Sequence, residues 1–576
     1  MIKKLSHYMN GYWKYVIIGT LAMITEVACE LILPSLMANI VDEGIVNKDM
    51  DIIVKNGIIM IIVALIGMTG GITCARFSAK SAMGFGAKVR NDMFAKISSF
   101  SFKNIDTFST ASLTTRMTND VTNLQNTIMM SLRILVRAPA MLVIAAVFAF
   151  SIDAKLSSVL LIALPIILIF VGVIMKIGYP LFSKMQKRID SLNSTVQENL
   201  IGMRVVKAFV REEHEKEKFK KANDNLMKIG FKASSIIVLA MPMMMLLFNI
   251  IIMLLIWNGG ARINAGNMGT GELFSLISYV MQILMSIIMV AMILIMVVRS
   301  KASGERIIEV LETDVDIKNA EETVAPALGG KVEFKNVNFR YSTQTSGDDI
   351  LSNINFTAEP GEFVAVIGGT GSGKSSLVNL IPRLYDVTGG QVLVDGVDVR
   401  DYDLKHLRDE IGVVLQKNTL FSGTIKENLL WGKKDATDEE IIEACKAASA
   451  HDFIMAQPEG YDTYLSQGGL NLSGGQKQRL CIARAMIGKP KIIILDDSTS
   501  AVDTATEANI RQSFSTLLKG TTVFMIAQRI SSIAHADKII VLNDGQISAI
   551  GTHEELLKTS EIYQEINATQ QKGVLS

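Results

Sequence analysis

The sequence predicts a multi-domain fold in which an all-α domain of six membrane-spanning helices precedes an α/β domain. Two observations carry this prediction: six long apolar stretches occupy residues 1 to about 300, and strand-like and helix-like segments alternate from Lys331 onward. Apolar residues make up 49% of the 576 residues and the mean hydropathy is +0.33, both high for a soluble enzyme. A chain of this length also exceeds what one hydrophobic core supports, so at least two domains are expected.

The apolar stretches are long enough to be membrane spans. Each approaches or exceeds the roughly 20 residues that cross about 30 Å of hydrocarbon. The first stretch is too long for a signal peptide and lacks a small-residue cleavage site, so we interpret it as a retained span. Only Ser151–Lys155 separates the third stretch from the fourth, which predicts a tight hairpin. The stretches lie near residues 16–40, 52–75, 134–151, 156–178, 236–257 and 273–298.

Basic residues are concentrated in two long intervals between the spans, 76–133 and 179–235. Because cytoplasmic loops carry the excess of Lys and Arg, both intervals, both termini and the second half of the chain are predicted to be cytoplasmic. The protein is therefore expected to be a multi-pass protein of the cytoplasmic membrane.

The interval around residues 192–209 repeats apolar residues at helical spacing. The simplest structure continues the membrane helices about 30–40 Å into the cytosol. The apolar stripe favours docking against another domain over a solvated, unpartnered hairpin.

Glu26 and Glu30 lie inside the first span, four residues apart and hence on one helix face. Intramembrane carboxylates are costly in lipid, so they are expected to face the bundle interior or a water-filled cavity. Two interpretations stay open: a substrate-cavity or proton-linked role, and a structural hydrogen-bond pair to a neighbouring helix.

Residues 363–376 hold the strongest motif. An apolar run, Phe363–Ile367, predicts a buried strand that leads into a full match to G-x-x-x-x-G-K-[ST]. Glycines let backbone N–H groups surround a phosphate chain, and the helix that follows directs its positive end at the same charge. Lys374 is predicted to reach the β- and γ-phosphates, and Ser375 to ligate Mg²⁺. The predicted ATP-binding positions are Gly368, Gly369, Thr370, Gly371, Ser372, Gly373, Lys374, Ser375 and Ser376.

A second site follows further along the chain. The apolar run after Lys491 ends in Asp496, the Walker B arrangement, which supports Mg²⁺ through water. Between the two motifs lie Gln416 and the segment Leu472–Gln476, which reads LSGGQ and precedes a helix predicted to begin near Lys477. Amides at a helix N-terminus bind phosphate. A nucleotide already held by the P-loop needs no second such surface, so this one is useful only to a second copy of the domain.

The composition also sets domain limits. Residues 1–312 are predicted to form the membrane domain with its cytoplasmic extensions, 313–330 an acidic linker, and 331–576 the nucleotide-binding domain. The four cysteines are far apart, which favours reduced thiols over disulfides or a zinc site. No motif indicates a nucleic-acid partner.

With these motifs the chain resembles the ATP-binding cassette (ABC) family, specifically a fused half-exporter of the type I kind. The resemblance implies that Tyr341 stacks on adenine, that Gln416 is the Q-loop residue at the Mg²⁺ site, and that Ser500–Asp503 is the D-loop. It implies head-to-tail dimers, with each ATP between one P-loop and the opposite signature, so Ser473 and Gly475 act in catalysis at the partner's site. Helical elbows near Ile105–Thr115 and Glu198–Phe209 would dock on the ATP-binding domains.

Two departures from the family pattern fall in one catalytic centre. Asp497 stands where the family has its hydrolytic glutamate, and Gln528 where it has its switch histidine. An aspartate carboxylate lies roughly 1–1.5 Å farther back, a displacement that can cost about a hundredfold in rate. Glutamine can donate a hydrogen bond to a γ-phosphate but cannot become cationic. The pattern resembles the degenerate-site subunit of heterodimeric bacterial multidrug exporters.

The sequence therefore predicts an ATP- and Mg²⁺-dependent exporter half with low hydrolytic activity at its own site. Its expected partners are a second half-exporter (a heterodimer, with a homodimer as the alternative), the lipid bilayer, and a small-molecule or peptide substrate. Multidrug or hydrophobic compounds are the expected cargo. A non-transporting membrane sensor with weak ATPase activity and a homodimeric peptide or lipid exporter remain alternatives.

Overall fold

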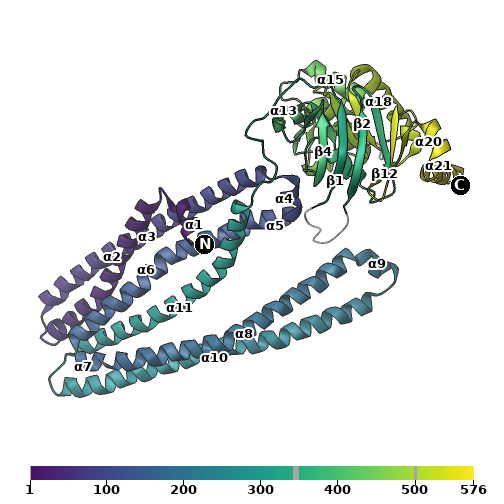
Figure 1. Ribbon diagram of the computed structural model, residues 1–576. Coiled ribbons are helices and arrows are strands. Elements are labelled where there is room, and N and C mark those ends of the chain that lie inside the picture. The colour runs from purple at the N-terminus through teal and green to yellow at the C-terminus, as the bar shows by residue number, and fades with distance from the viewer. Residues whose placement is uncertain (1, 342–348, 499–501, 576) are drawn as a thin grey trace. The chain divides into compact units, whose positions relative to one another are not determined.

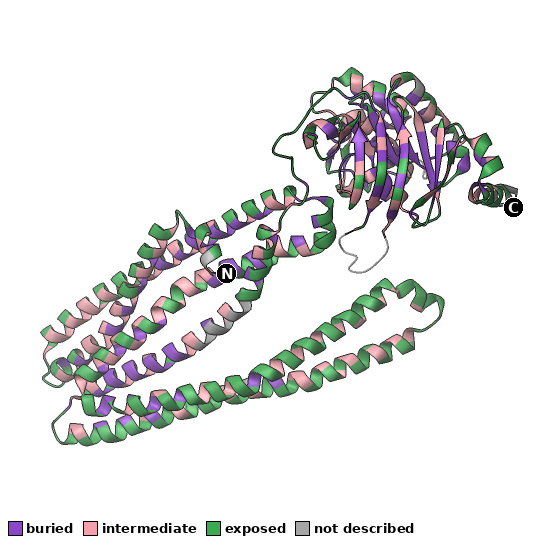
Figure 2. Cartoon of the chain, viewed as in Figure 1, coloured by how far each residue is buried: buried purple, intermediate pink, exposed green. Residues whose placement is uncertain are grey.

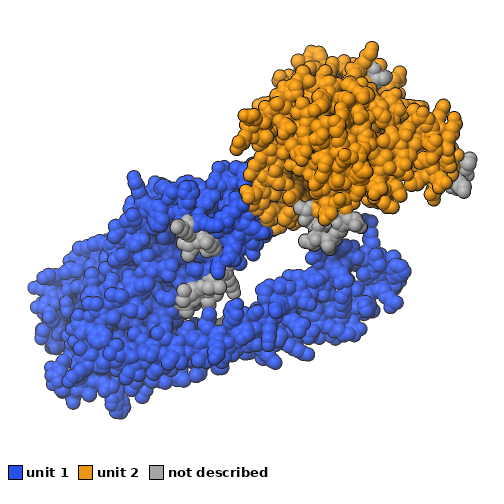
Figure 3. Space-filling view, in the orientation of Figure 1, with its two compact units in different colours: residues 1–97, 113–312 blue, residues 98–112, 313–576 orange. Residues whose placement is uncertain are grey.

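The structure is a computed structural model that describes residues 2–341, 349–498 and 502–575 (Figure 1). It divides into two compact units, shown in different colours in Figure 3. The first unit comprises Met1–Ile97 and Leu113–Glu312, and the second comprises Ser98–Ser112 and Thr313–Ser576. The chain therefore passes between the units three times.

The first unit is entirely helical. Six of its described helical stretches are long and apolar enough to cross a membrane, which confirms the predicted all-α domain with six spans. Of the shorter helices, α7 and α9 lie where the chain turns between long helices. The helices are α1 (Ile2–Leu5), α2 (Trp13–Asn39), α3 (Met50–Ser98), α5 (Thr110–Thr115), α6 (Val121–Ile152), α7 (Ala154–Ser157), α8 (Val159–Ile201), α9 (Met203–Ala208), α10 (Glu212–Asn264) and α11 (Thr270–Glu312).

Two packing groups form within this unit. Helix α6 packs against α2 and α11, while α8 pairs with α10. The turn between α6 and α8 is the predicted tight hairpin, because the Asp153 carboxylate accepts hydrogen bonds from the N–H groups of Lys155 and Leu156, both at 2.9 Å. Figure 2 shows α8 and α10 exposed along most of their length, whereas the first half of α11 is mostly buried or half-buried.

The second unit is the predicted α/β domain. Its larger sheet has the order β12-β11-β3-β10-β9-β6, in which all neighbouring pairs are parallel except β11 with β12. Strands β3, β9 and β10 are continuous apolar runs because helices and the second sheet cover both of their faces. These strands are β3 (Phe363–Gly368), β6 (Ile411–Val414), β9 (Ile492–Asp496), β10 (Thr522–Ile526), β11 (Lys538–Asn543) and β12 (Gln546–Gly551).

A four-stranded antiparallel sheet of order β2-β1-β4-β5 packs beside it, with a second apolar core between the two sheets. A separate hairpin joins β7 to β8. The strands are β1 (Val332–Phe339), β2 (Leu351–Ala358), β4 (Gly389–Val394), β5 (Val397–Asp398), β7 (Gly423–Thr424) and β8 (Tyr464–Leu465). The helices are α12 (Lys374–Asn379), α13 (Leu404–Asp409), α14 (Ile425–Leu429), α15 (Asp438–Ala447), α16 (His451–Met455), α17 (Gly474–Met486), α18 (Thr504–Leu517), α19 (Ile530–Ile533), α20 (His553–Thr559) and α21 (Glu561–Leu575).

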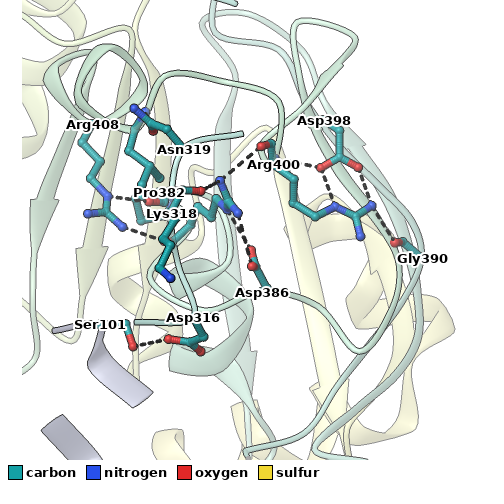
Figure 4. Close-up of polar contacts among 12 residues, drawn as sticks. Ser101, Asp316, Lys318, Asn319, Pro382, Asp386, Gly390, Asp398, Arg400 and Arg408 are labelled. Atoms are coloured by element: carbon teal, nitrogen blue, oxygen red, sulfur yellow. Dashed lines mark hydrogen bonds and ion pairs between the residues drawn. The ribbon is translucent and has the colours of Figure 1, made fainter. Parts of the chain in front are cut away.

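One short segment from the N-terminal half of the chain belongs to the second unit. Helix α4 (Phe102–Thr107) is capped at Ser101, whose hydroxyl also donates to Asp316 Oδ1 at 2.5 Å (Figure 4). The Tyr385 hydroxyl donates to Asp106 Oδ2 at 2.7 Å. The contact-based division therefore groups residues 98–112 with the ATP-binding half, while the domain limits expected from composition stay a prediction.

Candidate ATP-binding site

The P-loop runs from the end of β3 to the start of α12. Gly371 and Gly373 have φ values of 85° and 93°, a left-handed conformation that favours glycine. A Cβ at Gly373 would lie 2.8 Å from a Leu351 methyl carbon and 3.0 Å from the Ile350 carbonyl oxygen. Space and conformation both require glycine there, so the loop can bring its N–H groups close to a ligand.

A pocket of about 590 Å³ lies over this loop. It collects residues from Ile350 to Gln570, including the P-loop, the Q-loop position, the end of β9 and the segment after β10. The predicted site residues that line it are Gly368, Gly369, Thr370, Gly371, Gly373, Lys374, Ser375, Ser376, Gln416, Asp496, Asp497 and Gln528. The Ser372 side chain is outside this lining; it is buried, and its hydroxyl has no hydrogen-bond partner among the described residues.

Lys374, Ser375 and Asp496 form the polar floor of the pocket. Lys374 Nζ donates to the carbonyl oxygens of Gly368 at 3.0 Å and Gly369 at 2.7 Å. Burial lowers the pKa of Lys374, although the nearby carboxylates of Asp496 and Asp497 oppose the shift. Burial raises the pKa of Asp496, and the charge of Asp497 raises it further, while the Ser375 hydrogen bond lowers it.

The same floor offers oxygen ligands for a divalent cation. The Ser375 hydroxyl donates to Asp496 Oδ1 at 3.0 Å, and Gln416 lines the same pocket. A hydroxyl, a carboxylate and a side-chain amide are the hard oxygen donors that Mg²⁺ prefers. These residues therefore fit Mg²⁺ as well as the phosphates of a nucleotide.

Tyr341 lies one step outside this pocket. Its hydroxyl is 2.9 Å from Ser376 Oγ, and its ring makes edge-to-face contacts with Phe339 and Tyr385. Burial raises the pKa of Tyr341. It borders a separate cavity of about 380 Å³ shared with Tyr385 and Asp106. Tyr341 thus contacts the P-loop through one polar contact, and it shares its cavity with Asp106 of α4.

The two residues that depart from the family pattern touch each other. Gln528 Nε2 donates to Asp497 Oδ2 at 2.8 Å. Asp497 follows β9 with a φ of 49°, a left-handed conformation that aspartate tolerates better than most residues. Its backbone carbonyl accepts a hydrogen bond from Gln478 Nε2 at 3.2 Å. The carboxylate and the amide predicted to face the γ-phosphate are therefore held side by side.

The signature segment corrects one prediction. Helix α17 begins at Gly474 rather than near Lys477, because Ser473 is its N-cap in a reciprocal capping box with Gln476. Ser473 is exposed and Gly475 half-buried, and neither lines the pocket over this chain's own P-loop. The sequence signal for the earlier start, Ser-x-x-Gln, was present but overlooked.

Two other predicted segments are placed only in part. In the D-loop, Ser500 and Ala501 lie outside the described residues, and Asp503 caps α18 through the N–H of Thr506 at 2.9 Å. The second predicted elbow contains α9, near the tip of the α8–α10 hairpin. Several apolar side chains at that tip are more than 60% exposed. They are Leu200, Ile201, Val205, Phe209 and Val210.

In the first unit, Glu26 and Glu30 share an arginine that the sequence reasoning overlooked. Arg137 of α6 donates to Glu26 Oε1 at 2.7 Å and to Glu30 Oε2 at 2.6 Å. All three line a pocket of about 370 Å³ with α3. A Cβ at Gly71 would lie 3.1 Å from the Glu26 carboxyl group, so this glycine leaves the carboxylate room. The structural and the cavity interpretations of Glu26 and Glu30 both remain open. The two carboxylates accept hydrogen bonds from Arg137 of a neighbouring helix, and they also line a pocket.

Two further residues of the nucleotide pocket come from the C-terminal helix α21. Ile566 and Gln570 line it beside Gln528, almost 200 positions after the P-loop. They belong to no motif, and the amphipathic pattern of α21 predicts only a packed helix. No local signal in the sequence marks them.

Comparisons with known proteins agree with this geometry. A family model described as the ABC transporter transmembrane region matches residues 16–301, and one described as ABC transporter matches residues 351–500. The chain is 41% identical over 569 residues to YfiB, an uncharacterized ABC transporter ATP-binding protein of Bacillus subtilis, covering 99% of this chain and 98% of that protein.

Some relatives carry more specific names. An ATP-dependent lipid A-core flippase of Syntrophus aciditrophicus is 39% identical over 391 residues, covering 68% of this chain and 64% of that protein. A fatty acid ABC transporter ATP-binding/permease protein of Mycobacterium bovis is 35% identical over 444 residues, covering 77% and 70%. The chain therefore belongs to the ABC transporter family, as a half-exporter that joins one transmembrane domain and one ATP-binding domain in a single polypeptide.

Proposed function

We propose that this chain is the degenerate-site subunit of a heterodimeric, ATP-driven exporter in the cytoplasmic membrane. It binds ATP on its own P-loop, hydrolyses that ATP slowly, and supplies its signature segment to a competent site on a second half-exporter. The observation that carries this proposal is the 2.8 Å contact between Gln528 and Asp497, because it joins both departures from the family pattern in one catalytic centre.

Different residues of this chain would bind the phosphates, the Mg²⁺ ion and the adenine of the nucleotide. Lys374 and the P-loop N–H groups would bind the phosphates, and Ser375, Gln416 and Asp496 would hold Mg²⁺. Tyr341 stacks on the adenine. When bound, Mg²⁺ would supply positive charge that offsets the negative charge developing on the phosphates during transfer. The contacts of Lys374 with the loop carbonyls and of Ser375 with Asp496 support these roles.

Slow hydrolysis at this chain's own site is expected because of Asp497 and Gln528. A carboxylate that is one methylene shorter polarises the attacking water less effectively. An amide donor stabilises the γ-phosphate without adding positive charge. In addition, the hydrogen bond between Gln528 and Asp497 competes with the contacts of Gln528 to the γ-phosphate and of Asp497 to the attacking water. Binding without efficient hydrolysis is the expected result.

The partner's site needs an intact signature, and this chain has one. The exposed Ser473 and the N-terminal amides of α17 are free of the chain's own nucleotide pocket, as a role in trans requires. The apolar side chains exposed at the α9 tip also favour a second subunit, since large exposed apolar groups mark interaction sites.

The proposed cargo is hydrophobic or amphipathic. The names of two relatives, a lipid A-core flippase and a fatty acid transporter, point to molecules with long apolar parts. Nucleotide-driven closure of the ATP-binding domains would switch the membrane cavity from inward to outward access.

The test compares the purified full-length chain in lipid nanodiscs, alone and co-expressed with a second half-exporter that has Glu and His at the two altered positions. We expect low Mg·ATP hydrolysis alone and a large gain in the pair, with Lys374→Ala of the chain alone as the background control for the first measurement. Robust, substrate-stimulated hydrolysis by the chain alone would favour a homodimer. Hydrolysis without ligand flux in proteoliposomes would favour the membrane sensor.

A further inference from the structure

The C-terminal helix α21 contacts the segment that carries Gln528. Gln570 Nε2 donates to the backbone carbonyl oxygen of Gln528 at 2.7 Å, and Gln570 Oε1 accepts from the N–H of Ile530 at 2.9 Å. One side-chain amide thus brackets the segment from Gln528 to Ile530 with two hydrogen bonds. Only this orientation of the amide satisfies both groups, because the carbonyl must accept and the N–H must donate.

The amide is itself held in place by the packing of its helix. Tyr563 of α21 is fully buried in the core, and its hydroxyl is 2.7 Å from His553 Nδ1. Ile562 and Ile566 pack against the same core. Gln570 lies one turn beyond Ile566, so its position relative to β10 is fixed by a docked helix rather than by a mobile tail.

Gln528 connects Gln570 to the other residues of the nucleotide pocket. Gln528 binds Gln570 through its backbone and Asp497 through its side chain, at 2.8 Å. Gln570 and Gln528 both line the pocket. A backbone fixed on both sides of Gln528 restricts where its amide can point, and such pre-organisation lowers the entropy cost of contacting a ligand.

We propose that Gln570 is a positioning residue of this site. It fixes the backbone of residues 528–530 so that the Gln528 side chain contacts the γ-phosphate. Gln570 thereby sets the preference of the site for ATP over ADP. The inference rests on the proposed role of Gln528. The C-terminal helix then senses the γ-phosphate, because any shift of Gln528 toward the nucleotide is transmitted to α21.

The experiment measures Mg·ATP and Mg·ADP affinity of the full-length chain in nanodiscs by displacement of a fluorescent nucleotide. Gln570→Ala is expected to weaken ATP binding about five- to tenfold, the value of one or two hydrogen bonds, with ADP binding unchanged. Gln564→Ala is the matched control, since it removes a glutamine amide of the same helix that donates to the Leu557 carbonyl at 2.8 Å, away from the pocket.

Two further variants make the result decisive. Gln528→Ala should abolish the ATP preference, and adding Gln570→Ala to it should change nothing more, because Gln570 acts through Gln528. Gln570→Glu should also lose the preference, since it retains the acceptor for Ile530 but places a carboxylate against the Gln528 carbonyl.

The outcomes separate the two proposals. If Gln528→Ala leaves the ATP preference intact, the role of Gln528 in the proposed function fails. If Gln528→Ala removes it while Gln570→Ala behaves like Gln564→Ala, only the positioning role is overturned. Equal weakening of ATP and ADP by Gln570→Ala would also overturn it, because that result indicates general loss of structure.

Discussion

Two surfaces of the ATP-binding half differ in how their polar groups are arranged. The P-loop face comprises Gly368–Ser376 with Asp496, Asp497 and Gln528, and the signature face comprises Leu472–Gln476. On the P-loop face the polar side chains bind one another: Lys374 binds loop carbonyls, Ser375 binds Asp496, and Gln528 binds Asp497. On the signature face, Ser473 is exposed and its polar contacts are with its own helix cap. The first face gathers its polar groups over one pocket, while the second lies outside that pocket, as the role in trans that we propose for it requires.

The difference has a chemical side. Asp497 and Gln528 alter the groups that would act on the attacking water and the γ-phosphate, whereas the LSGGQ segment is unaltered. In the proposed function, the segment that serves the partner is kept while the groups that serve the chain's own site are altered. The two faces can therefore be tested separately, and each variant below changes one of them.

The largest effect is expected from the signature face. In the heterodimer, Ser473→Ala should lower Mg·ATP hydrolysis about a hundredfold, because it removes one preorganised donor from the partner's site. Single-turnover assays of the complex measure this loss. The control is Ser513→Ala on α18, whose hydroxyl donates to the Asn509 carbonyl. Unchanged hydrolysis after Ser473→Ala would mean that the partner's site does not use this face.

The next effect concerns repair of the P-loop face. Asp497→Glu with Gln528→His should raise hydrolysis at this site about tenfold or more, and by more than either change alone. The assay uses a complex whose partner lacks its own catalytic glutamate, so only this site can report. No gain there would locate the impairment in the partner's signature rather than in these two residues.

Lys374→Ala should weaken ATP binding at this site about tenfold, because it deletes a charged hydrogen-bond donor to the phosphates. Turnover by the heterodimer should largely persist, since the competent site contains the partner's P-loop and this chain's signature. Filter-binding and steady-state assays on one preparation test both parts. Full loss of turnover, together with an inert Ser473→Ala, would reverse the assignment of the two sites.

The smallest effect is a narrowed pH range for Mg·ATP binding. Burial raises the pKa of Asp496, so on acidification it takes up a proton, and loses its hold on Mg²⁺, at a higher pH than an ordinary aspartate. Burial lowers the pKa of Lys374, so its charge is lost at a lower pH than usual as pH rises. Titrations of affinity between about pH 5 and 10 should show both limits. Asp496→Asn should remove the acidic limit.

Sequence reasoning found the residues whose chemistry depends on near neighbours in the chain. A strand, a glycine loop and a helix follow one another in Phe363–Asn379, so the P-loop could be predicted with its geometry. Six long apolar stretches likewise predicted the helices of the first unit. The start of α17 was misplaced because the capping box of Ser473 and Gln476 was not read as a helix signal.

Residues that act through tertiary contacts could not be found in this way. Arg137 lies within an apolar stretch, and only the packing of α6 against α2 shows that it pairs with both Glu26 and Glu30. Gln570 lies in an ordinary amphipathic helix, and its role depends on where that helix docks. Both cases concern pairs separated by more than 40 residues, for which periodicity carries no information.

The inclusion of residues 98–112 in the second unit has a consequence for how the protein can be divided. The chain links its two units after Ile97, after Ser112 and after Glu312. A cut after Glu312 would yield a C-terminal fragment that lacks α4 and leaves the ring of Tyr385 without Phe102 and Asp106. Each additional covalent link removes rotational freedom between two bodies. The architecture therefore favours one gene product over two separable ones, and it makes the ATP-binding half a poor candidate for expression by itself.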